Sequence, residues 1–251
     1  HMVLNSIRAN RVKFHAEYGE LVICADDRNY WRRNNFPYYK ASRRKARDKD
    51  ELDWNAIFTS LNKIRDELKE FFPYKTLQVE TAEADDIIGT LAHKFGTELN
   101  MGEKILILSG DKDYIQLHTY ANVDQYDPVR KRWIRHDNPE KYLEEHIIKG
   151  DSGDGVPNVL SPDNCFVVGE RQKPITKKRL EEFSNINNLA EAVKRNYYRN
   201  KSLIDLSEVP DNIKELIMEA YENTEAGNRS HLFNYFVKNK LRNLMQNLSE
   251  F

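Results

Sequence analysis

The chain has 251 residues, of which 39% are hydrophobic and 31% are charged, and its formal net charge at pH 7 is −1. This length suits one large domain or two modest ones. The near-zero charge excludes a global field that attracts nucleic acid, so only a local basic patch could do so. No signal peptide and no apolar run of about eighteen residues is present, which indicates an intracellular protein without a membrane span. The two cysteines, Cys24 and Cys165, are expected to be buried free thiols.

The first half of the chain alternates between helix and strand patterns. We expect strands over residues 20–25, 75–79, 104–109, 122–126 and 132–135, and helices over 3–17, from Asp53 or Asn55 to about 69, and from 84 onward. These units predict an α/β fold over residues 1–136, with a parallel or mixed sheet flanked by helices.

Acidic residues follow the apolar strands of this half. The candidate metal ligands are Asp26, Glu83, Asp85, Asp86, Asp111 and Asp113. The carboxyl ends of strands in an open α/β sheet meet at one edge. Two carboxylates about 4 Å apart there repel by roughly 4 kcal/mol at an effective dielectric near 20, and divalent cations would remove this repulsion. The pattern therefore predicts a metal site. The alternative is that these acids only form turns or stabilise a first helical turn.

Residues 28–47 combine basic and aromatic side chains and contain no acid. The basic candidates for nucleic-acid contact are Arg32, Arg33, Lys40, Arg43, Arg44 and Arg47. Positive charges neutralise phosphates and aromatic rings stack on bases, so the segment favours nucleic-acid binding. If 38–48 is helical, Lys40, Arg43 or Arg44, and Arg47 share one face. The alternative is a solvated basic loop or a helix that covers an acidic partner.

From residue 137 onward the pattern is helical, and we expect a second, mainly helical domain over 137–251. The expected helices are 140–149, one from Pro174, 188–199, 211–222 capped by Asp211, and 230–248 capped by Ser230. Asp151 and Asp154 lie in a glycine-rich loop that would supply a second metal site if it folds back on the sheet; Asx turns are the alternative. Lys173, Lys177 and Lys178 oppose a helix dipole, which indicates an anionic ligand. The seven histidines show no catalytic spacing and receive no predicted role.

Three motifs in this order and spacing resemble the flap endonuclease and 5′→3′ exonuclease family. They are Glu83-Ala-Asp85-Asp86, Asp111-Lys-Asp113 and Gly150-Asp151-Ser-Gly-Asp154. Asp26 after a strand and Tyr39-Lys40 with Arg43 extend the resemblance, which covers almost the whole chain. Phrases such as Tyr30-Trp31-Arg32-Arg33 and Gln116-Leu117-His118 are similar to the ribonuclease H branch of T-even phages.

The resemblance implies a PIN-like nuclease that removes RNA primers and short DNA from 5′ ends at the lagging strand with two Mg²⁺ ions, for which Mn²⁺ can substitute. It implies that Asp26, Glu83, Asp85, Asp86, Asp111 and Asp113 hold or orient one ion, and that Asp151 and Asp154 serve the other. It implies charge stabilisation on the phosphodiester by Lys40 and Arg43, and stacking of Tyr39 on a terminal base. It also implies a helix–three-turn–helix element that grips duplex DNA, in which Lys177 and Lys178 bind phosphate.

The partners implied by the resemblance are DNA and RNA–DNA hybrids with a 5′ end, flap or fork, a sliding clamp and a single-strand binding protein. A monomer in the cytoplasm of a phage-infected bacterium is expected. In one respect the chain departs from the family, which begins with an apolar strand ending in a metal-binding aspartate. No aspartate precedes Ala25 here, so we expect that this first segment is missing and that the chain as given is inactive without it.

A second departure concerns the glycine-rich hairpin that binds a monovalent cation in the family. Gly155-Val-Pro157 is followed by Asn158 without a second glycine pair, so a bound potassium ion is not expected. Two other functions stay open on the residues alone. One is a non-catalytic module that binds forked DNA, and the other is a PIN-type single-stranded ribonuclease. The helical second half, with Asp151 and Asp154, counts against the ribonuclease.

Overall fold

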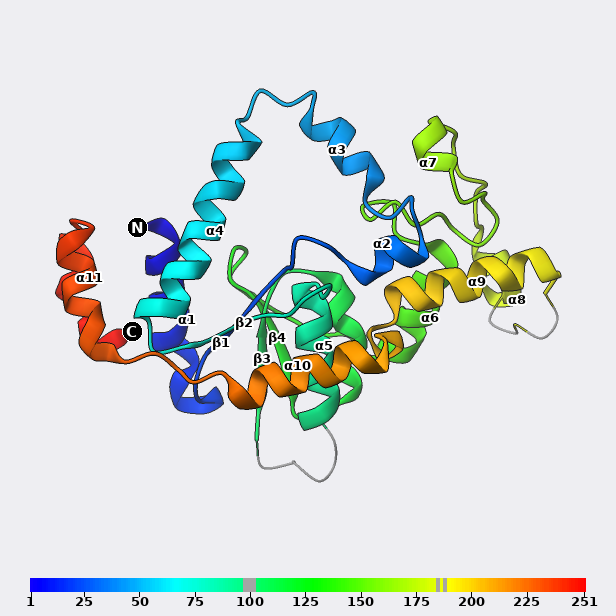
Figure 1. Cartoon of the computed structure of the whole chain (residues 1–251). Coiled ribbons are helices and arrows are strands. Elements are labelled where there is room, and N and C mark those ends of the chain that lie inside the picture. Colours follow the sequence, from blue (N-terminus) through cyan, green and yellow to red (C-terminus); the bar gives the residue numbers. More distant parts are fainter. Residues whose placement is uncertain (97–102, 184–185, 187–188) are drawn as a thin grey trace.

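A computed structural model describes residues 1–96, 103–183, 186 and 189–251, except for the side chains of residues 44–46 (Figure 1). In its first half the elements are α1 (Met2–Tyr18), β1 (Val22–Ala25), α2 (Trp31–Asn35), α3 (Ala41–Arg47), α4 (Trp54–Phe71), β2 (Lys75–Gln78), α5 (Ala84–Phe95), β3 (Ile105–Leu108), the 3₁₀ helix η2 (Lys112–Thr119), β4 (Val123–Asp127) and β5 (Arg132–Ile134). Each predicted strand is confirmed with slightly different ends. None of the described helices is long and apolar enough to span a membrane.

The strands form two sheets rather than the single sheet expected. β1 pairs in parallel with β2, with Val22 opposite Lys75, while β3 pairs in parallel with β4 and β4 in antiparallel with β5. A cavity of about 240 Å³, called here the inter-sheet cavity, lies between β1 and β3. Val22 and Cys24 line it from β1, residues 105–108 from β3, and parts of α1 and α5 close it. The predicted α/β class, with parallel and mixed sheets flanked by helices, is confirmed.

The second half is helical, as predicted, but several boundaries differ. Its elements are α6 (Pro139–Lys149), α7 (Cys165–Val168), α8 (Lys177–Phe183), α9 (Glu191–Ile204), η4 (Leu206–Glu208), α10 (Asp211–Asn223), η5 (Arg229–His231), α11 (Leu232–Lys238), α12 (Arg242–Met245) and η6 (Leu248–Glu250). The helix expected from Pro174 starts three residues later because the Thr176 hydroxyl accepts the Arg179 N–H and caps it. The expected start at residue 188 lies outside the described residues.

The predicted helix 230–248 is wrong as one element. Lys240 has φ 56°, and the Leu241 N–H donates to the Phe236 carbonyl at 2.9 Å, which ends α11 in a left-handed C-terminal turn. The predicted caps are wrong too, because Pro210 precedes α10 without a side-chain cap and Asn228 caps η5.

Helices of the second half pack onto the first half. One core cluster joins Leu4 of α1 and Leu68 of α4 to Phe236 of α11, together with the C-terminal Phe251. A second joins Leu77 and Ile87 to Ile213 and Ile217 of α10. Figure 1 shows the two termini close together beside α11. Both clusters combine residues from each side of position 136, and the domain boundary placed there stays a prediction.

Candidate active site

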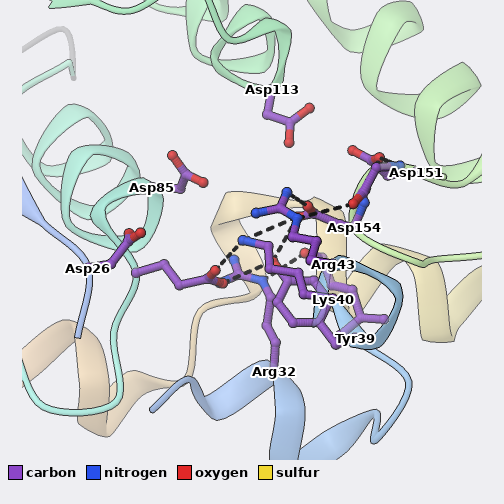
Figure 2. A network of polar contacts seen from close by, with 12 residues as sticks. Asp26, Arg32, Tyr39, Lys40, Arg43, Asp85, Asp113, Asp151 and Asp154 are labelled. Carbon is purple, nitrogen blue, oxygen red and sulfur yellow. Dashed lines mark hydrogen bonds and ion pairs between the residues drawn. The ribbon is translucent and has the colours of Figure 1, made fainter. Parts of the chain in front are cut away.

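Acidic side chains from separate segments meet where β1 and β3 end. The Ala84 N–H at the start of α5 donates to Asp26 Oδ1 at 2.7 Å, which ties the end of β1 to α5. After β3, the Asp113 N–H donates to Asp111 Oδ1 at 3.1 Å and opens η2. The loop after α6 reaches the same place, since Asp85, Asp113, Asp151 and Asp154 line one small cavity. Figure 2 shows the carboxylates of Asp26, Asp85, Asp113 and Asp151 around a common space.

Buried cations neutralise one side of this site, called here the neutralised half. Arg32 is 2% exposed, and its Nη1 lies 2.9 Å from Glu83 Oε2 and 2.7 Å from Asp86 Oδ1. Glu83 and Asp86 also form a capping box at the start of α5, and the Trp31 indole donates to Asp86 at 3.0 Å. Burial raises the pKa of Glu83, but Lys40 and Arg32 outweigh it and hold that pKa below the ordinary value.

Three predicted site residues lie on this buried side. Glu83 and Asp86, predicted to hold or orient metal, are 1% and 0% exposed and have cationic partners. Arg32, predicted to contact nucleic acid, has a buried guanidinium whose Nε donates to the Leu203 carbonyl at 2.8 Å. A buried charge needs its partner, so these pairs also support the fold, and the three predicted roles stay predictions.

Tyr39, Lys40 and Arg43 lie on the same side and surround Asp154. The Tyr39 hydroxyl lies 3.0 Å from Glu83 Oε2 and 2.9 Å from Asp154 Oδ2, Lys40 pairs with both acids, and Arg43 pairs with Asp154. Burial raises the pKa of Tyr39, and the two carboxylates raise it further. Tyr39 is 3% exposed in this structure, which contains no nucleic acid, and its stacking on a terminal base stays a prediction. Arg43 stays 48% exposed and can reach a ligand.

On the other side of the site carboxylates dominate, and we call this the acidic half. Its members are Asp26, Asp85, Asp111, Asp113, Asp151 and His146. Burial raises the pKa of Asp85 to about 6, opposed by the Tyr114 hydroxyl and Lys40, and Asp111 adds to the rise. Burial likewise raises the pKa of Asp113 to about 7, opposed by His146, and Asp111 and Asp151 add to it.

The donors of the acidic half fit a divalent cation better than those of the neutralised half. Asp113, His146 and Asp151 each offer one ligand atom, and these atoms lie within 4.8 Å of one another. Asp85 and Asp111 are further carboxylates close enough to raise the pKa of Asp113. Carboxylate oxygens are the donors that hard divalent ions select, so these residues could hold a metal.

The other predicted basic contacts are placed mostly at the surface. Arg33, Lys173, Lys177 and Lys178 are exposed. Arg47 is half-buried, with its guanidinium 5.4 Å from the Phe58 ring, and the Arg44 side chain lies outside the described part of the chain. These positions leave the four exposed cations accessible to phosphate.

Sequence reasoning missed His146 and Tyr114. His146 occupies the last turns of α6 and faces both Asp113 and Asp151, while the Tyr114 hydroxyl donates to Asp85. The sequence did contain one indication for His146. It lies five residues before Asp151, and the helix between them ends at Gly150, whose φ of 67° turns the chain. This spacing does not match the histidine metal-binding motif H-E-x-x-H.

Comparisons with known proteins cover both halves of the chain. Residues 1–148 match the family model of the 5′–3′ exonuclease N-terminal resolvase-like domain, and residues 138–251 match the model of the T4 RNase H C-terminal region. Ribonuclease H of Enterobacteria phage T4 is 37% identical over an alignment that covers 100% of this chain and 86% of that protein. The flap endonuclease Xni of Shewanella woodyi is 28% identical, with 59% of this chain and 57% of that protein covered.

Solved structures show the same fold. The T5 5′-exonuclease with bound zinc has a TM-score of 0.63 at 17% identity, and the match covers 88% of this chain and 90% of that one. A T5 flap endonuclease in a pseudo-enzyme–product complex with DNA and metal ions has a TM-score of 0.61 at 18% identity, with 87% and 91% covered.

Proposed function

The chain belongs to the 5′–3′ exonuclease family and is therefore a phosphodiester hydrolase, and we propose that it is a metal-dependent nuclease that removes RNA primers and adjacent DNA from 5′ ends during lagging-strand replication. The observation that carries the proposal is the division of one acidic site into two halves. Cations neutralise Glu83, Asp86 and Asp154, whereas the acidic half keeps a concentration of carboxylates that repel one another.

Two Mg²⁺ ions are proposed for the acidic half. Asp26, Asp85 and Asp111 would hold one, and Asp113 and Asp151 would hold the other. When bound, such ions lower the pKa of a bound water and neutralise charge on the phosphodiester. The T4 relative is named a ribonuclease H and the T5 structure holds DNA with metal ions, which supports this assignment by analogy.

The protein's own side chains would position the nucleic acid. Arg43 is an exposed cation that pairs with Asp154, and we assign it to the phosphate next to the cleaved bond, with Lys40 behind it. Figure 1 shows α3 and α4 rising as an arch above β1 and β2, and Arg43 lies on this arch. Arg33, Lys173, Lys177 and Lys178 are assigned to the phosphates of a duplex or flap, where each contact adds to salt-sensitive affinity. A sliding clamp and a single-strand binding protein are proposed partners.

A cleavage assay tests the proposal with 5′-labelled RNA–DNA hybrids and 5′-flap DNA, with Mg²⁺ or with chelator. Two polypeptides are compared in this assay. One is the 251-residue chain, and the other is the same chain with an N-terminal extension that forms an apolar strand ending in aspartate. We expect short products only with Mg²⁺. Since residues that merely orient a metal ligand are worth about 10–100-fold, Asp111→Asn should reduce the rate at least about 100-fold. The exposed Asp137→Asn is the matched control and should cleave normally.

The assay also separates the competing functions. Salt-sensitive binding to forked DNA without cleavage by either polypeptide would favour the non-catalytic binding module. Cleavage of single-stranded RNA with no preference for a hybrid or a flap would favour the PIN-type ribonuclease. Either result would overturn the proposed function.

A further inference from the structure

Tyr114 follows directly after Asp113, and its side chain is buried. It is 3% exposed and belongs to a core cluster whose other members include Ile107 of β3 and Leu117 of η2. A phenylalanine ring would fill the same space, so packing alone does not account for the hydroxyl. A hydroxyl among apolar side chains is costly to bury unless it has a hydrogen-bond partner. The partner that it has therefore indicates its role.

The partner of this hydroxyl is the carboxylate of Asp85. The Tyr114 hydroxyl donates to Asp85 Oδ1. Within the described part of the chain, this is the only hydrogen bond that the Asp85 side chain accepts, which leaves Oδ2 available. Asp85 is half-buried in the first turn of α5, and Figure 2 shows it beside the space that Asp113 also borders. The hydroxyl thus holds one oxygen of a carboxylate whose other oxygen can bind a cation.

This hydrogen bond joins two segments that supply acids to the site. Asp111 caps η2 and Asp113 lies in its first turn, whereas Asp85 belongs to α5, which packs against η2. The acids of the two segments repel one another, so without a link they would tend to move apart. Because Tyr114 is part of η2, its hydroxyl fixes the position of Asp85 relative to Asp111.

We propose that Tyr114 is a positioning residue of the acidic half, whose hydroxyl fixes the Asp85 carboxylate toward the divalent ion proposed for that carboxylate. The inference deepens the proposed function, on which it rests for the assignment of Asp85 to an ion. Carboxylates that bind metals are themselves hydrogen-bonded, and loss of such an outer partner typically weakens metal binding about 10–100-fold. Tyr114 acts only through Asp85 and touches neither the ion nor the substrate.

Metal titration without nucleic acid separates the role of the hydroxyl from that of the ring. Calorimetry with MnCl₂ as the probe measures metal affinity, and thermal unfolding measures the stability of each variant. Tyr114→Phe removes only the hydroxyl, whereas Tyr114→Leu removes the ring as well. We expect both variants to bind Mn²⁺ about 10-fold more weakly than the wild type. Only Tyr114→Leu should have a much lower Tm, because it alone leaves a cavity in the core.

The matched control is Tyr120→Phe, which makes the same chemical change elsewhere. The Tyr120 hydroxyl lies 2.6 Å from His93 Nδ1, and it links the C-terminal end of η2 to the last turn of α5. These are the opposite ends of both helices from Asp85 and Asp113. Tyr120→Phe should therefore bind Mn²⁺ like the wild type.

Three results would overturn the positioning role. The first is wild-type Mn²⁺ affinity in Tyr114→Phe, which decides the matter even if Tyr114→Leu does not fold. The second is an equal loss of affinity in Tyr120→Phe, because the loss would then come from a looser contact between η2 and α5. The third is the absence of Mn²⁺ binding by the wild type.

Cleavage of 5′-flap DNA separates this inference from the proposed function. Tyr114→Phe should need more Mg²⁺ for its half-maximal rate, whereas a loss of folded protein would lower the rate equally at every Mg²⁺ concentration. A wild type that cleaves flaps while Tyr114→Phe binds Mn²⁺ normally contradicts only the positioning role. A chain whose Mn²⁺ affinity depends on the hydroxyl but that cleaves nothing, with or without the added strand, contradicts only the nuclease function.

Discussion

At the scale of single residues, the surroundings of each carboxylate decide its role. Glu83 and Asp113 both lie next to a strand end and both are partly or fully buried, yet Arg32 and Lys40 hold the pKa of Glu83 low. Burial raises the pKa of Asp113 to about 7, and Asp111 and Asp151 raise it further, while His146 lowers it. Carboxylates that are paired with buried cations support the fold, whereas carboxylates that mainly face one another are available to an added ion.

The Arg32 pairs give a sharp test of this division. Arg32→Met removes the guanidinium that faces two buried acids and leaves their charge uncompensated, which should cost about 3–5 kcal/mol of unfolding free energy. Urea denaturation measures the loss. The adjacent Arg33→Met is the control, because Arg33 is exposed, and its change should stay within about 0.5 kcal/mol. Equal stability of the two variants would contradict a structural role for Arg32.

The convergence of Asp26, Asp85, Asp111 and Asp113 could be predicted, because each of them lies close after a predicted strand. The inward orientation of the Arg32 side chain could not be predicted from the sequence. Its acidic partners lie about fifty positions further along the chain, and only the folded backbone brings them together. His146 was missed for a similar reason. Its relation to Asp151 depends on the turn at Gly150, and its relation to Asp113 depends on the packing of α6 against η2.

At the scale of elements, α9 fixes the loop that carries Asp151 and Asp154. Asn200 is fully buried, and its amide donates to the Ile147 carbonyl at 2.7 Å and to the Pro157 carbonyl at 2.9 Å. Arg199 donates to the same Pro157 carbonyl at 2.7 Å. The two ends of the loop are therefore held by one helix, so a ligand need not order the loop from a free state.

Asp163 accepts hydrogen bonds from Arg195 and Arg199 of α9, and its charge makes the stability of this region depend on pH. Burial raises the pKa of Asp163, but hydrogen bonds from Arg195 and Arg199 outweigh it and hold the pKa below its ordinary value. A lowered folded-state pKa contributes stability above the unfolded value, about 3.9, and that stability is lost as pH falls through the folded value. Asp163→Asn should therefore cost about 1–2 kcal/mol at pH 7.

Thermal unfolding at pH 7 and near pH 3 measures this dependence. The difference between the wild type and Asp163→Asn should shrink at the lower pH, because the stability that comes from the lowered pKa of Asp163 is lost as pH falls below the unfolded value and through the folded one. Asp137→Asn is exposed and should follow the wild type at both pH values. A cost that is the same at both pH values would show that the charge of Asp163 is not its source.

Strands were easier to predict than the last helices. The apolar runs at 21–25 and 105–108 are short and bounded by polar residues, so their length and composition both favour strands. The stripe over 230–248 has helical periodicity, but the chain turns at Lys240, and the buried side chains come from α11 and α12. Phe236 and Leu244 pack in the core with α1 and α4, whereas Phe233 and Val237 are exposed, and a local pattern does not report such a turn.

At the scale of the whole molecule, the two sheets are joined by helices rather than by strand pairing. Among the described residues β1 has hydrogen-bonded ladder contacts only with β2, and β3 only with β4. The inter-sheet cavity separates them, and its lining includes Val22, Cys24 and residues 105–108. The strand edges there have the unpaired N–H and C=O groups that accept a further strand.

We expect an N-terminal extension with an apolar strand to insert into the inter-sheet cavity. Burial of two apolar side chains contributes roughly 3–6 kcal/mol and each new ladder hydrogen bond about 0.5–1.5 kcal/mol, against about 1–2 kcal/mol for the ordering of each added residue. We expect the sum of these contributions to be a net gain of about 2 kcal/mol. That gain corresponds to a rise in Tm of about 4–8 °C for a chain of this size. Calorimetry measures the rise, and hydrogen exchange should show slower exchange for amides of β1 and β3. The control extension carries proline at its centre, which cannot donate to a strand ladder. Equal Tm values for the two extensions would mean that the cavity does not accept a strand.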